Sequence, residues 1–520
     1  MTDDIMTTEL QEQSARQAES PREPTEENAT VLQAFEWYIP DDGQHWNNLK
    51  KNLKEYKDIG ITAMWIPPPC KASTPSGNGY DIYDLWDLGE FDQKGLRATK
   101  WGSKEDLDSF ANAAKYTGML LYMDVVLNHK AAADKTERCM AVEVDPDGEF
   151  IADVSEPYEI EGWLGFDFPG RGDKYSALKW HWEHFTGTDY NAENEKTAIY
   201  RILGDNKSWA TNVDKENGNF DYLMFADIDH AHPEVKEDIN RWGLWVSKEL
   251  SLRGMRFDAV KHFSEVYLGE FINHLKEHSN KDFFFVGEFW KDSLEDMLKY
   301  LDRMKTDKFS LFDAPLVYNF SEASRTEAYD LSKIFDGSLV QARPVNSVTL
   351  VMNHDTQPHQ ALAAPIEGFF KPIAYALILL RREGYPCVFW GDLEGIANPD
   401  YKEPPSCGGK LSDIILARSL YAYGDQHDYF DYPTCLGWVR RGTWDRSNGM
   451  AVVVSNAGPG EKKMFVGEEH AGQVWTDVLG WEPGEVTIDD DGFGLFKCPG
   501  VSIAIWVNKD AGGRDRFGKF

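Results

Sequence analysis

The fold of this chain is restricted chiefly by eight short apolar runs that recur along it. They are TVLQAF (30–35), ITAMWIP (61–67), MLLYMDVVL (119–127), GMRFDAV (254–260), FFFVGEF (283–289), LFDAPL (311–316), SVTLVM (347–352) and YPCVFW (385–390). Between most of them lie segments with helical spacing, and several of these end in glycine, as a helix C-cap would. Strands that are apolar throughout suit a parallel sheet buried on both faces. The alternation therefore predicts an α/β fold, a (β/α)8 TIM barrel.

The alternation is interrupted once, and it stops before the end of the chain. Roughly 125 residues separate the third and fourth runs, far more than a βα loop needs, so we expect an inserted domain at 130–230. Short alternating strands such as MAVVVSN and VSIAIWV predict a C-terminal antiparallel β-sandwich at 427–510. The barrel would then comprise 30–129 and 231–426, flanked by a disordered acidic tail at 1–29 and a short tail at 511–520.

Charge and cysteine usage limit the partners and the compartment. The chain has 54 basic and 87 acidic residues, a formal net charge of −33, which repels phosphate backbones and anionic lipid. The tail has no apolar core of a signal peptide, and no run approaches the ~20 apolar residues that span a bilayer. The six cysteines are scattered, as expected of reduced thiols. We therefore expect a cytoplasmic chain, acting as a monomer, with no nucleic-acid or membrane partner.

Acidic residues stand at the ends of several predicted strands. The fourth strand is expected to end at Asp258, Glu288 lies at the end of the fifth run, and Asp355 follows the seventh. The active site of such a barrel lies at the C-terminal ends of its strands, so these carboxylates should converge. Any one of them alone could be a helix N-cap or half of a structural ion pair. Three together, each after an apolar strand, favour a catalytic site.

Crowded carboxylates can divide the work of cleaving an acetal between sugars. Their pKa values are pushed apart, so one can stay protonated as a general acid while another is ionised as a nucleophile. Arg256 shares a strand face with Asp258 and would keep it ionised. Tyr80, in a polar loop, and Trp290, directly after GEF, are the aromatic residues most suited to face a sugar ring, although most aromatic residues here must be core.

Five segments resemble the signature motifs of the α-amylase family of glycoside hydrolases. They are DVVLNH (124–129), LMFADIDH (223–230), GMRFDAVKHF (254–263), FFFVGEFW (283–290) and LVMNHD (350–355). The longer segments GYDIYDLWDLGEF, WHWEHFTGTDY and NHDTQP are similar to the liquefying bacterial α-amylases and their intracellular bacterial and fungal relatives. The resemblance implies retaining endo-hydrolysis of α-1,4-glucans such as starch, glycogen or malto-oligosaccharides.

The resemblance also implies a role for each matching residue. Asp258 would be the nucleophile, Glu288 the general acid/base, and Asp355 the carboxylate that stabilises the transition state. The substrate-binding residues would be Tyr80, His129, Arg256 and His354 around the reacting sugar, and Lys261, His262 and Trp290 on the leaving-group side.

The family binds structural calcium between the barrel and the inserted domain. The residues that match the ligands of this shared site are Asn128, Asp221, Asp227 and the backbone carbonyl of His262. The liquefying bacterial enzymes add further metals, but three of those ligand positions are Thr186, Ala210 and Ala231 here, although Asp229 remains. We therefore expect a single Ca²⁺.

Two alternatives to a hydrolase remain open on sequence alone. A 4-α-glucanotransferase would keep the same catalytic residues and pass the glycosyl unit to another sugar, as in relatives linked to cell-wall α-glucan synthesis. A glucan-binding regulatory protein could use the same scaffold with little turnover. The presence of all three carboxylates argues against the second alternative.

Overall fold

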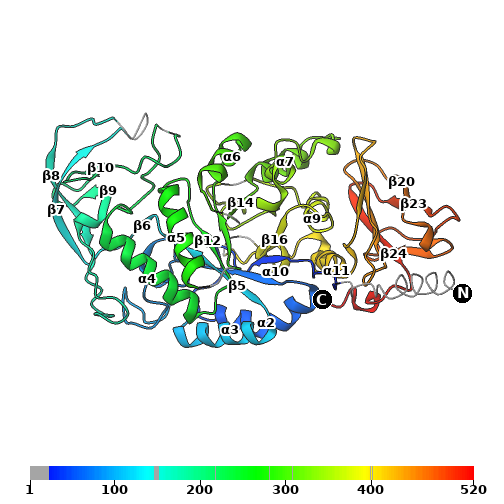
Figure 1. Ribbon diagram of the computed structural model, residues 1–520, viewed down its shortest axis with the longest axis horizontal. Helices are drawn as coiled ribbons and strands as arrows, with labels where there is room; N and C mark the ends of the chain where they lie inside the picture. The colour runs from blue at the N-terminus through cyan, green and yellow to red at the C-terminus, as the bar shows by residue number, and fades with distance from the viewer. Residues whose placement is uncertain are drawn as a thin grey trace, which may run out of the picture.

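The eight apolar runs form a closed parallel barrel, which confirms the predicted fold class (Figure 1). Around the barrel the strands follow the order β1-β16-β15-β14-β13-β12-β5-β2. In chain order they are β1 (Val31–Gln33), β2 (Ala63–Ile66), β5 (Leu120–Val125), β12 (Gly254–Phe257), β13 (Phe284–Gly287), β14 (Phe309–Phe312), β15 (Ser347–Leu350) and β16 (Tyr385–Phe389). The computed structural model describes residues 23–145, 152–216, 218–279, 282–306, 309–362, 364–398, 400 and 402–520.

Helices surround the barrel, and their ends follow the local sequence. The longer ones are α2 (His45–Ile59), α3 (Lys104–Thr117), α4 (Pro233–Glu249), α5 (Glu265–His278), α6 (Leu294–Arg303), α7 (Ala314–Arg325), α9 (Lys371–Leu379) and α11 (Leu411–Tyr421); α8 (Leu339–Ala342) and α10 (Trp390–Glu394) are short. Ser103 and Asp106 form a capping box that starts α3, and Gly118 ends it at a φ of 73°.

The sixth predicted strand differs from the structure in its end. The run LFDAPL was expected to be strand through residue 316, but β14 ends at Phe312. Asp313 accepts a hydrogen bond from the backbone N–H of Leu316 and caps α7, and Pro315 lies in the first turn of that helix. An N-cap followed by proline is a helix start signal, and it overrides the apolar character of the run.

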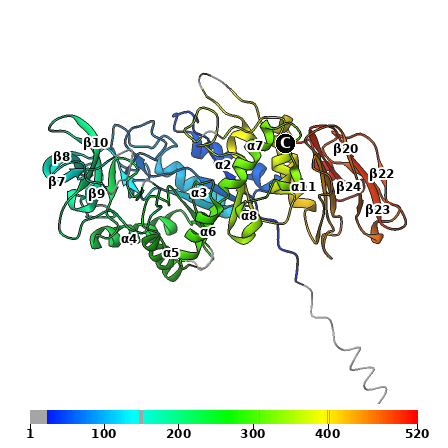
Figure 2. The ribbon, with the colours of Figure 1, turned by 90° about the horizontal axis from the view of Figure 1, so that it is seen from above.

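The long interruption after β5 folds into a separate sheet. Its strands are β6 (His129–Lys130), β7 (Lys135–Glu143), β8 (Tyr158–Gly165), β9 (Phe185–Asn191), β10 (Lys196–Ile202) and β11 (Ala226–Ile228), in the order β6-β11-β9-β10-β7-β8. A small pair, β3 (Lys71–Ala72) and β4 (Ile82–Asp84), lies before it in the chain. The sheet occupies one end of the molecule, and the C-terminal strands occupy the other (Figures 1 and 2).

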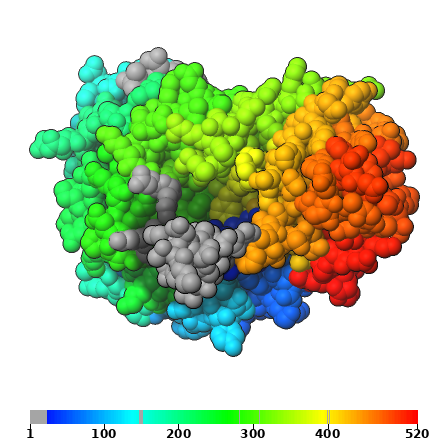
Figure 3. All heavy atoms as spheres, turned by 45° about the vertical axis from the view of Figure 1, so that its right-hand side comes forward, coloured from blue at the N-terminus to red at the C-terminus, as the bar shows by residue number. Residues whose placement is uncertain are grey.

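The C-terminal strands form two layers, the antiparallel sandwich that was expected. One sheet has the order β17-β18-β19-β24-β21-β22, and the other pairs β20 with β23. The strands are β17 (Gln426–Tyr429), β18 (Cys435–Arg440), β19 (Met450–Ser455), β20 (Gly460–Phe465), β21 (Val474–Asp477), β22 (Val486–Thr487), β23 (Phe493–Cys498) and β24 (Ser502–Asn508). In the space-filling view these residues, orange to red, form a lobe beside the barrel (Figure 3).

The beginning of the described chain is bound to this lobe. The backbone N–H of Thr25 donates to Asp445 at 2.9 Å, and the side-chain amide of Asn28 donates to the carbonyls of Arg418 and Ala422. Residues 25–28 therefore differ from the disordered tail expected at 1–29, because partners distant in sequence hold them. The rest of that expectation, at 1–22, lies outside the described residues. Within the described ranges, none of the helices is long and apolar enough to cross a membrane.

Candidate active site

Neighbouring barrel strands bring the predicted carboxylates together. Asp258 directly follows β12 and Glu288 directly follows β13, and these two strands are paired in parallel register. Each residue is only 8 % exposed, and both carboxylates accept hydrogen bonds from the guanidinium of Arg256. Asp355 lies in the loop after β15, and its charge interacts with those of Asp258 and Glu288. The structure thus places all three acids in one group at the carboxyl end of the barrel.

Arg256 is the cation at the centre of this group. Its Nη1 donates to Asp258 at 2.7 Å and to Asp124 at 2.8 Å, and its Nη2 donates to Glu288 at 2.7 Å. The sequence predicted that Arg256 would keep Asp258 ionised and bind near the reacting sugar. The structure adds Asp124, a fully buried carboxylate on β5 that also accepts from Trp65 Nε1 and the Tyr80 hydroxyl. Asp124 thereby fixes the position of the Arg256 guanidinium.

Burial raises the pKa values of the three acids. The pKa of Glu288 rises to about 7, chiefly through burial and then through the charge of Asp258. Burial raises the pKa of Asp258 as well, while the guanidinium of Arg256 opposes the rise. Burial and the charge of Glu288 raise the pKa of Asp355 well above its usual range. Such a group can hold a proton on one carboxyl at neutral pH while an arginine-paired neighbour is ionised.

His354 lies beside Asp355 in a defined tautomer. Burial lowers the pKa of His354 far below its usual value, so the ring is neutral. The amide of Gln33 donates to His354 Nδ1 at 3.0 Å, which leaves the ring proton on Nε2, 3.2 Å from a carboxylate oxygen of Asp355. The rings of Trp37, Tyr80 and His354 lie within 7° of parallel, with centroids 5.0 to 6.0 Å apart. Such parallel aromatic planes can pack against a sugar ring.

Three residues predicted for the leaving-group side lie beyond Asp258 and Glu288. Lys261 Nζ is 3.1 Å from a carboxylate oxygen of Glu216. His262 is buried, and its Nδ1 lies 3.0 Å from the carbonyl of Phe220. Trp290 is 7 % exposed, and its Nε1 donates to the Tyr318 hydroxyl. Lys261 and His262 therefore contact Glu216 and Phe220 of the long insertion, whereas Trp290 is too enclosed to stack freely on a sugar.

Three of the predicted calcium ligands, Asn128, Asp221 and Asp227, lie close together near the start of β6 and β11. The backbone N–H of Ile228 donates to the carbonyl of Asn128, and Asp227 lies opposite His129 in the β6–β11 pair. His129 itself is buried, with Nε2 2.8 Å from the carbonyl of Tyr80. Asp221 joins the group, because its charge raises the pKa of Asp227. The His262 side chain contacts the backbone carbonyl of Phe220, the residue before Asp221.

The oxygen atoms at this site are suitable ligands for a calcium ion. Asn128 Oδ1 is buried and has no hydrogen-bond partner among the described residues. Burial raises the pKa of Asp221 to about 8 and that of Asp227 well above its usual range. Hard oxygen atoms that are buried together, with one amide oxygen unpaired, are the ligand set that Ca²⁺ prefers. A divalent cation would compensate the clustered carboxylates.

Thr186, Ala210 and Ala231 stand where the liquefying enzymes have ligands for further metals, and here each makes a hydrogen bond to a carboxylate instead. The Thr186 hydroxyl donates to Asp227, and the backbone N–H groups of Ala210 and Ala231 donate to Asp221 and Asp229. Lys207 is a further residue that sequence reasoning missed. Its ammonium, 7 % exposed, lies 3.1 Å from Asp229 and donates to the carbonyls of Glu183 and Phe185.

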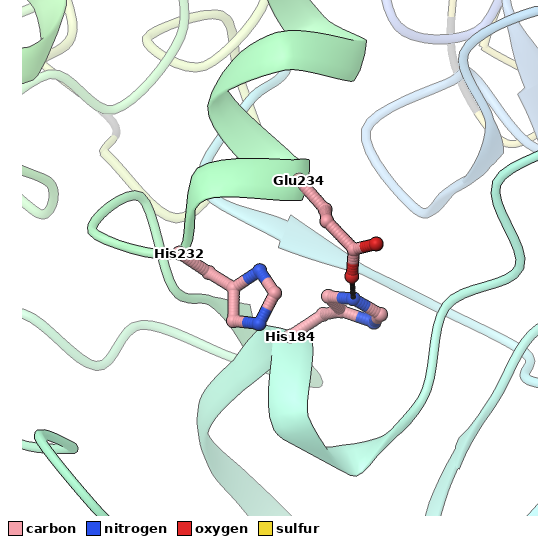
Figure 4. Close-up of side chains that lie close together, drawn as sticks. All are labelled: His184, His232 and Glu234. Atoms are coloured by element: carbon pink, nitrogen blue, oxygen red, sulfur yellow. Dashed lines mark hydrogen bonds and ion pairs between the residues drawn. The ribbon is translucent and has the colours of Figure 1, made fainter.

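A second group with ligand-like spacing lies nearby. His184, at the end of a short 3-10 helix (Trp182–His184), faces His232 and Glu234 at the start of α4, with ligand atoms within 4.8 Å (Figure 4). However, His184 Nδ1 accepts the backbone N–H of His181 at 2.8 Å. The ring proton is therefore on Nε2, which donates to Glu234 at 3.3 Å. This geometry favours a hydrogen bond that joins the inserted sheet to α4 over a metal at Nε2.

Comparison with known proteins gives the family. Residues 42–414 match the model of the alpha amylase catalytic domain. The chain is 46 % identical to a glucan 1,4-alpha-maltohexaosidase of Bacillus sp. (strain 707), over 93 % of each chain. It is 42 % identical to the cytoplasmic alpha-amylase of Escherichia coli (strain K12), over 92 % of this chain and 99 % of that one. A solved Anoxybacillus alpha-amylase has the same fold, with a TM-score of 0.62 at 18 % identity over 94 % of this chain and 99 % of that one.

Proposed function

The chain belongs to the α-amylase family of glycoside hydrolases, and we propose that it is a retaining, endo-acting α-amylase. Its substrates are internal α-1,4-glucosidic bonds of starch, glycogen or maltodextrins. The observation that carries the proposal is the pair of buried carboxyls, Asp258 and Glu288, which are both hydrogen-bonded to the guanidinium of Arg256. A nucleophilic carboxylate beside a carboxyl that can hold a proton is the pair that a retaining glycosidase uses, which supports retention.

The reaction proceeds in two displacements at the same sugar carbon. Asp258 attacks the anomeric carbon while Glu288, protonated because its pKa is about 7, gives its proton to the departing glycosidic oxygen. The ionised Glu288 then takes a proton from a water molecule, which attacks the anomeric carbon of the glycosyl–Asp258 ester from the face that the first leaving group vacated and releases Asp258 as a carboxylate. Arg256 neutralises Asp258 in the free enzyme, and Asp355 with His354 stabilises the positively charged transition state and holds sugar hydroxyls.

The substrate lies along the carboxyl ends of the strands. Tyr80, with Trp37 and His354, packs against the reacting sugar, and His129 supports Tyr80 through its backbone carbonyl. Lys261 and His262 bind on the leaving-group side, where Trp290 forms an apolar wall. A cation such as Lys261 also keeps the acidic pocket from becoming uniformly negative.

We propose that the enzyme binds one calcium ion. Asn128, Asp221, Asp227 and the backbone carbonyl of His262 would hold it. When bound, the ion supplies positive charge that joins the inserted sheet to the barrel. Lys207 provides a built-in cation for Asp229, which supports one metal rather than a cluster.

The proposal includes a location and a partner class. The net charge of −33 supports a neutral α-glucan partner rather than nucleic acid or an anionic membrane. The six reduced, buried cysteines and the relative named a cytoplasmic alpha-amylase support a cytoplasmic location. We propose that the enzyme acts as a monomer.

Product sizing with maltoheptaose tests the activity. The wild type should release only shorter sugars, and Asp258→Asn should release none. Oligosaccharides longer than the substrate would instead indicate a 4-α-glucanotransferase, because another sugar would then have intercepted the glycosyl ester. Absence of products with the wild type would favour a glucan-binding protein.

A further inference from the structure

Two cysteines from different layers of the C-terminal sandwich lie close together. Cys435 begins β18 in the six-stranded sheet, and Cys498 ends β23 in the two-stranded sheet. We propose that these two residues form a redox modification site, which hydrogen peroxide closes to a disulfide and which a dithiol opens again. The modification would act on the lobe beside the barrel (Figure 3), and it does not depend on the proposed hydrolase activity.

Gly460 leaves space for the two sulfur atoms beside each other. A Cβ atom added to Gly460 would lie 2.5 Å from Cys435 Sγ and 3.5 Å from Cys498 Sγ. Gly460 begins β20, where it pairs with Cys498, and its φ is not positive. Glycine is therefore needed at this position for space rather than for a left-handed backbone. Both sulfur atoms adjoin the space that a larger residue would fill.

The two thiols differ in acidity and in exposure. The Cys498 thiol lowers the pKa of Cys435, and the Lys462 ammonium lowers it further. The pKa of Cys498 is raised by the Cys435 thiol and by burial. Cys435 is 6 % exposed and Cys498 is 1 % exposed. Because the thiolate is the reactive form, Cys435 should react with the oxidant first, and Cys498 should then attack the oxidised sulfur.

The other four cysteines are poor competitors for the oxidant. Burial raises the pKa of Cys139 and of Cys387 to about 12. Burial also raises the pKa of Cys70 and of Cys407 well above its usual value. Such thiols are neutral near pH 7 and react slowly with a peroxide. Oxidation should therefore begin at Cys435.

The reaction requires a two-electron oxidant, which hydrogen peroxide supplies. The Cys435 thiolate attacks one peroxide oxygen, the O–O bond breaks, and hydroxide leaves, so that the sulfur becomes a sulfenic acid. The Cys498 sulfur then attacks the sulfenic sulfur and forms the S–S bond. The hydroxide displaced in this step takes the Cys498 proton and leaves as water. A dithiol such as dithiothreitol reverses the change by thiol–disulfide exchange.

The disulfide would join the two layers of the sandwich at a point next to the barrel. The carbonyl of Pro433, two residues before Cys435, accepts a hydrogen bond from the backbone N–H of Leu331. The closed loop from Cys435 to Cys498 would restrict the unfolded chain, which stabilises the folded state. Oxidation should therefore raise the melting temperature and leave catalysis in the barrel unchanged.

Thiol counting on the full chain tests the proposal. The reduced protein would be treated with a small excess of hydrogen peroxide, and its thiols would then be titrated in denaturant. We expect the count to fall from six to four, and a digest to contain a peptide pair linked through Cys435 and Cys498. The melting temperature should rise by about 3 to 8 °C. Dithiothreitol should reverse these changes, and kcat/KM for maltoheptaose should stay within about twofold throughout.

Two variants make the test specific. Cys498→Ser keeps Cys435 without its partner, so peroxide should leave a sulfenic acid on Cys435 that dimedone traps, with no rise in melting temperature. Cys139→Ser, which replaces a buried cysteine of the inserted sheet, is the matched control. This variant should lose two of its five thiols and show the same rise as the wild type.

Three results would overturn the proposal. The wild type could keep all six thiols after peroxide treatment, or its linked peptides could lack Cys435 or Cys498. Cys498→Ser could also show the same rise in melting temperature as the wild type. None of these results would affect the proposed hydrolase activity, which is measured separately with maltoheptaose.

Discussion

Raising the pH should abolish the activity because Glu288 loses the proton that it donates to the leaving group. Burial and the charge of Asp258 set the pKa of Glu288 at about 7. A general acid works only in its protonated form, so the active fraction falls as pH rises through that value. At pH 8 about one tenth of the enzyme keeps the proton, and at pH 9 about one hundredth, so kcat/KM for maltoheptaose should fall roughly tenfold per pH unit.

A substrate whose leaving group needs no proton isolates this effect. With α-maltosyl fluoride, fluoride departs without general acid, so the alkaline fall near pH 7 should disappear. Glu288→Gln should lose at least about a hundredfold in kcat/KM on maltoheptaose, yet release a burst of about one fluoride per enzyme before slowing, because water then lacks its base. The reasoning is refuted if the alkaline fall is the same with both substrates, or if Glu288→Gln cleaves maltoheptaose at the wild-type rate.

Three further variants or treatments test the supporting groups. Asp124→Asn should lower kcat/KM for maltoheptaose roughly tenfold to a hundredfold, since Arg256 loses a charged partner; unchanged kinetics would show that Asp124 does not position it. Elemental analysis should find about one calcium per chain, and a chelator should lower the melting temperature; about three metals per chain would contradict the single site. Lys207→Met should destabilise the fold by about 3 kcal/mol in urea unfolding, because Asp229 is left buried without its cation, and an unchanged midpoint would count against this role.

The barrel could be predicted because each strand is buried on both faces. Runs such as residues 119–127 and 254–260 are apolar except for the residues that form the site, namely Asp124, Arg256 and Asp258. The placement of Asp258 and Glu288 then follows from topology, because neighbouring parallel strands end at the same edge. The end of β14 was missed because the apolar residues after Asp313 belong to a helix whose cap and proline were the decisive signals.

Residues whose role depends on distant partners could not be predicted. Asp124 lies inside an apolar run, and only the fold shows that it reaches Arg256, 132 residues later. Gln33 is the last residue of the first strand, and Trp37 follows shortly after it. Both could have been found by searching the carboxyl ends of the strands for polar and aromatic residues. The contacts of Lys207 with Asp229 and of Thr25 with Asp445 join segments that no local pattern relates.

Trapping the glycosyl–enzyme ester is the most direct test of the central claim, that Asp258 is the nucleophile of a retaining enzyme. The protein would be incubated with 5-fluoro-α-glucosyl fluoride, digested, and sequenced by mass spectrometry. The account predicts one added fluoroglucosyl group, on the peptide GMRFDAVKHF and specifically on Asp258. A label on Glu288 or Asp355, or rapid turnover of the reagent with inversion and no labelled peptide, would contradict it.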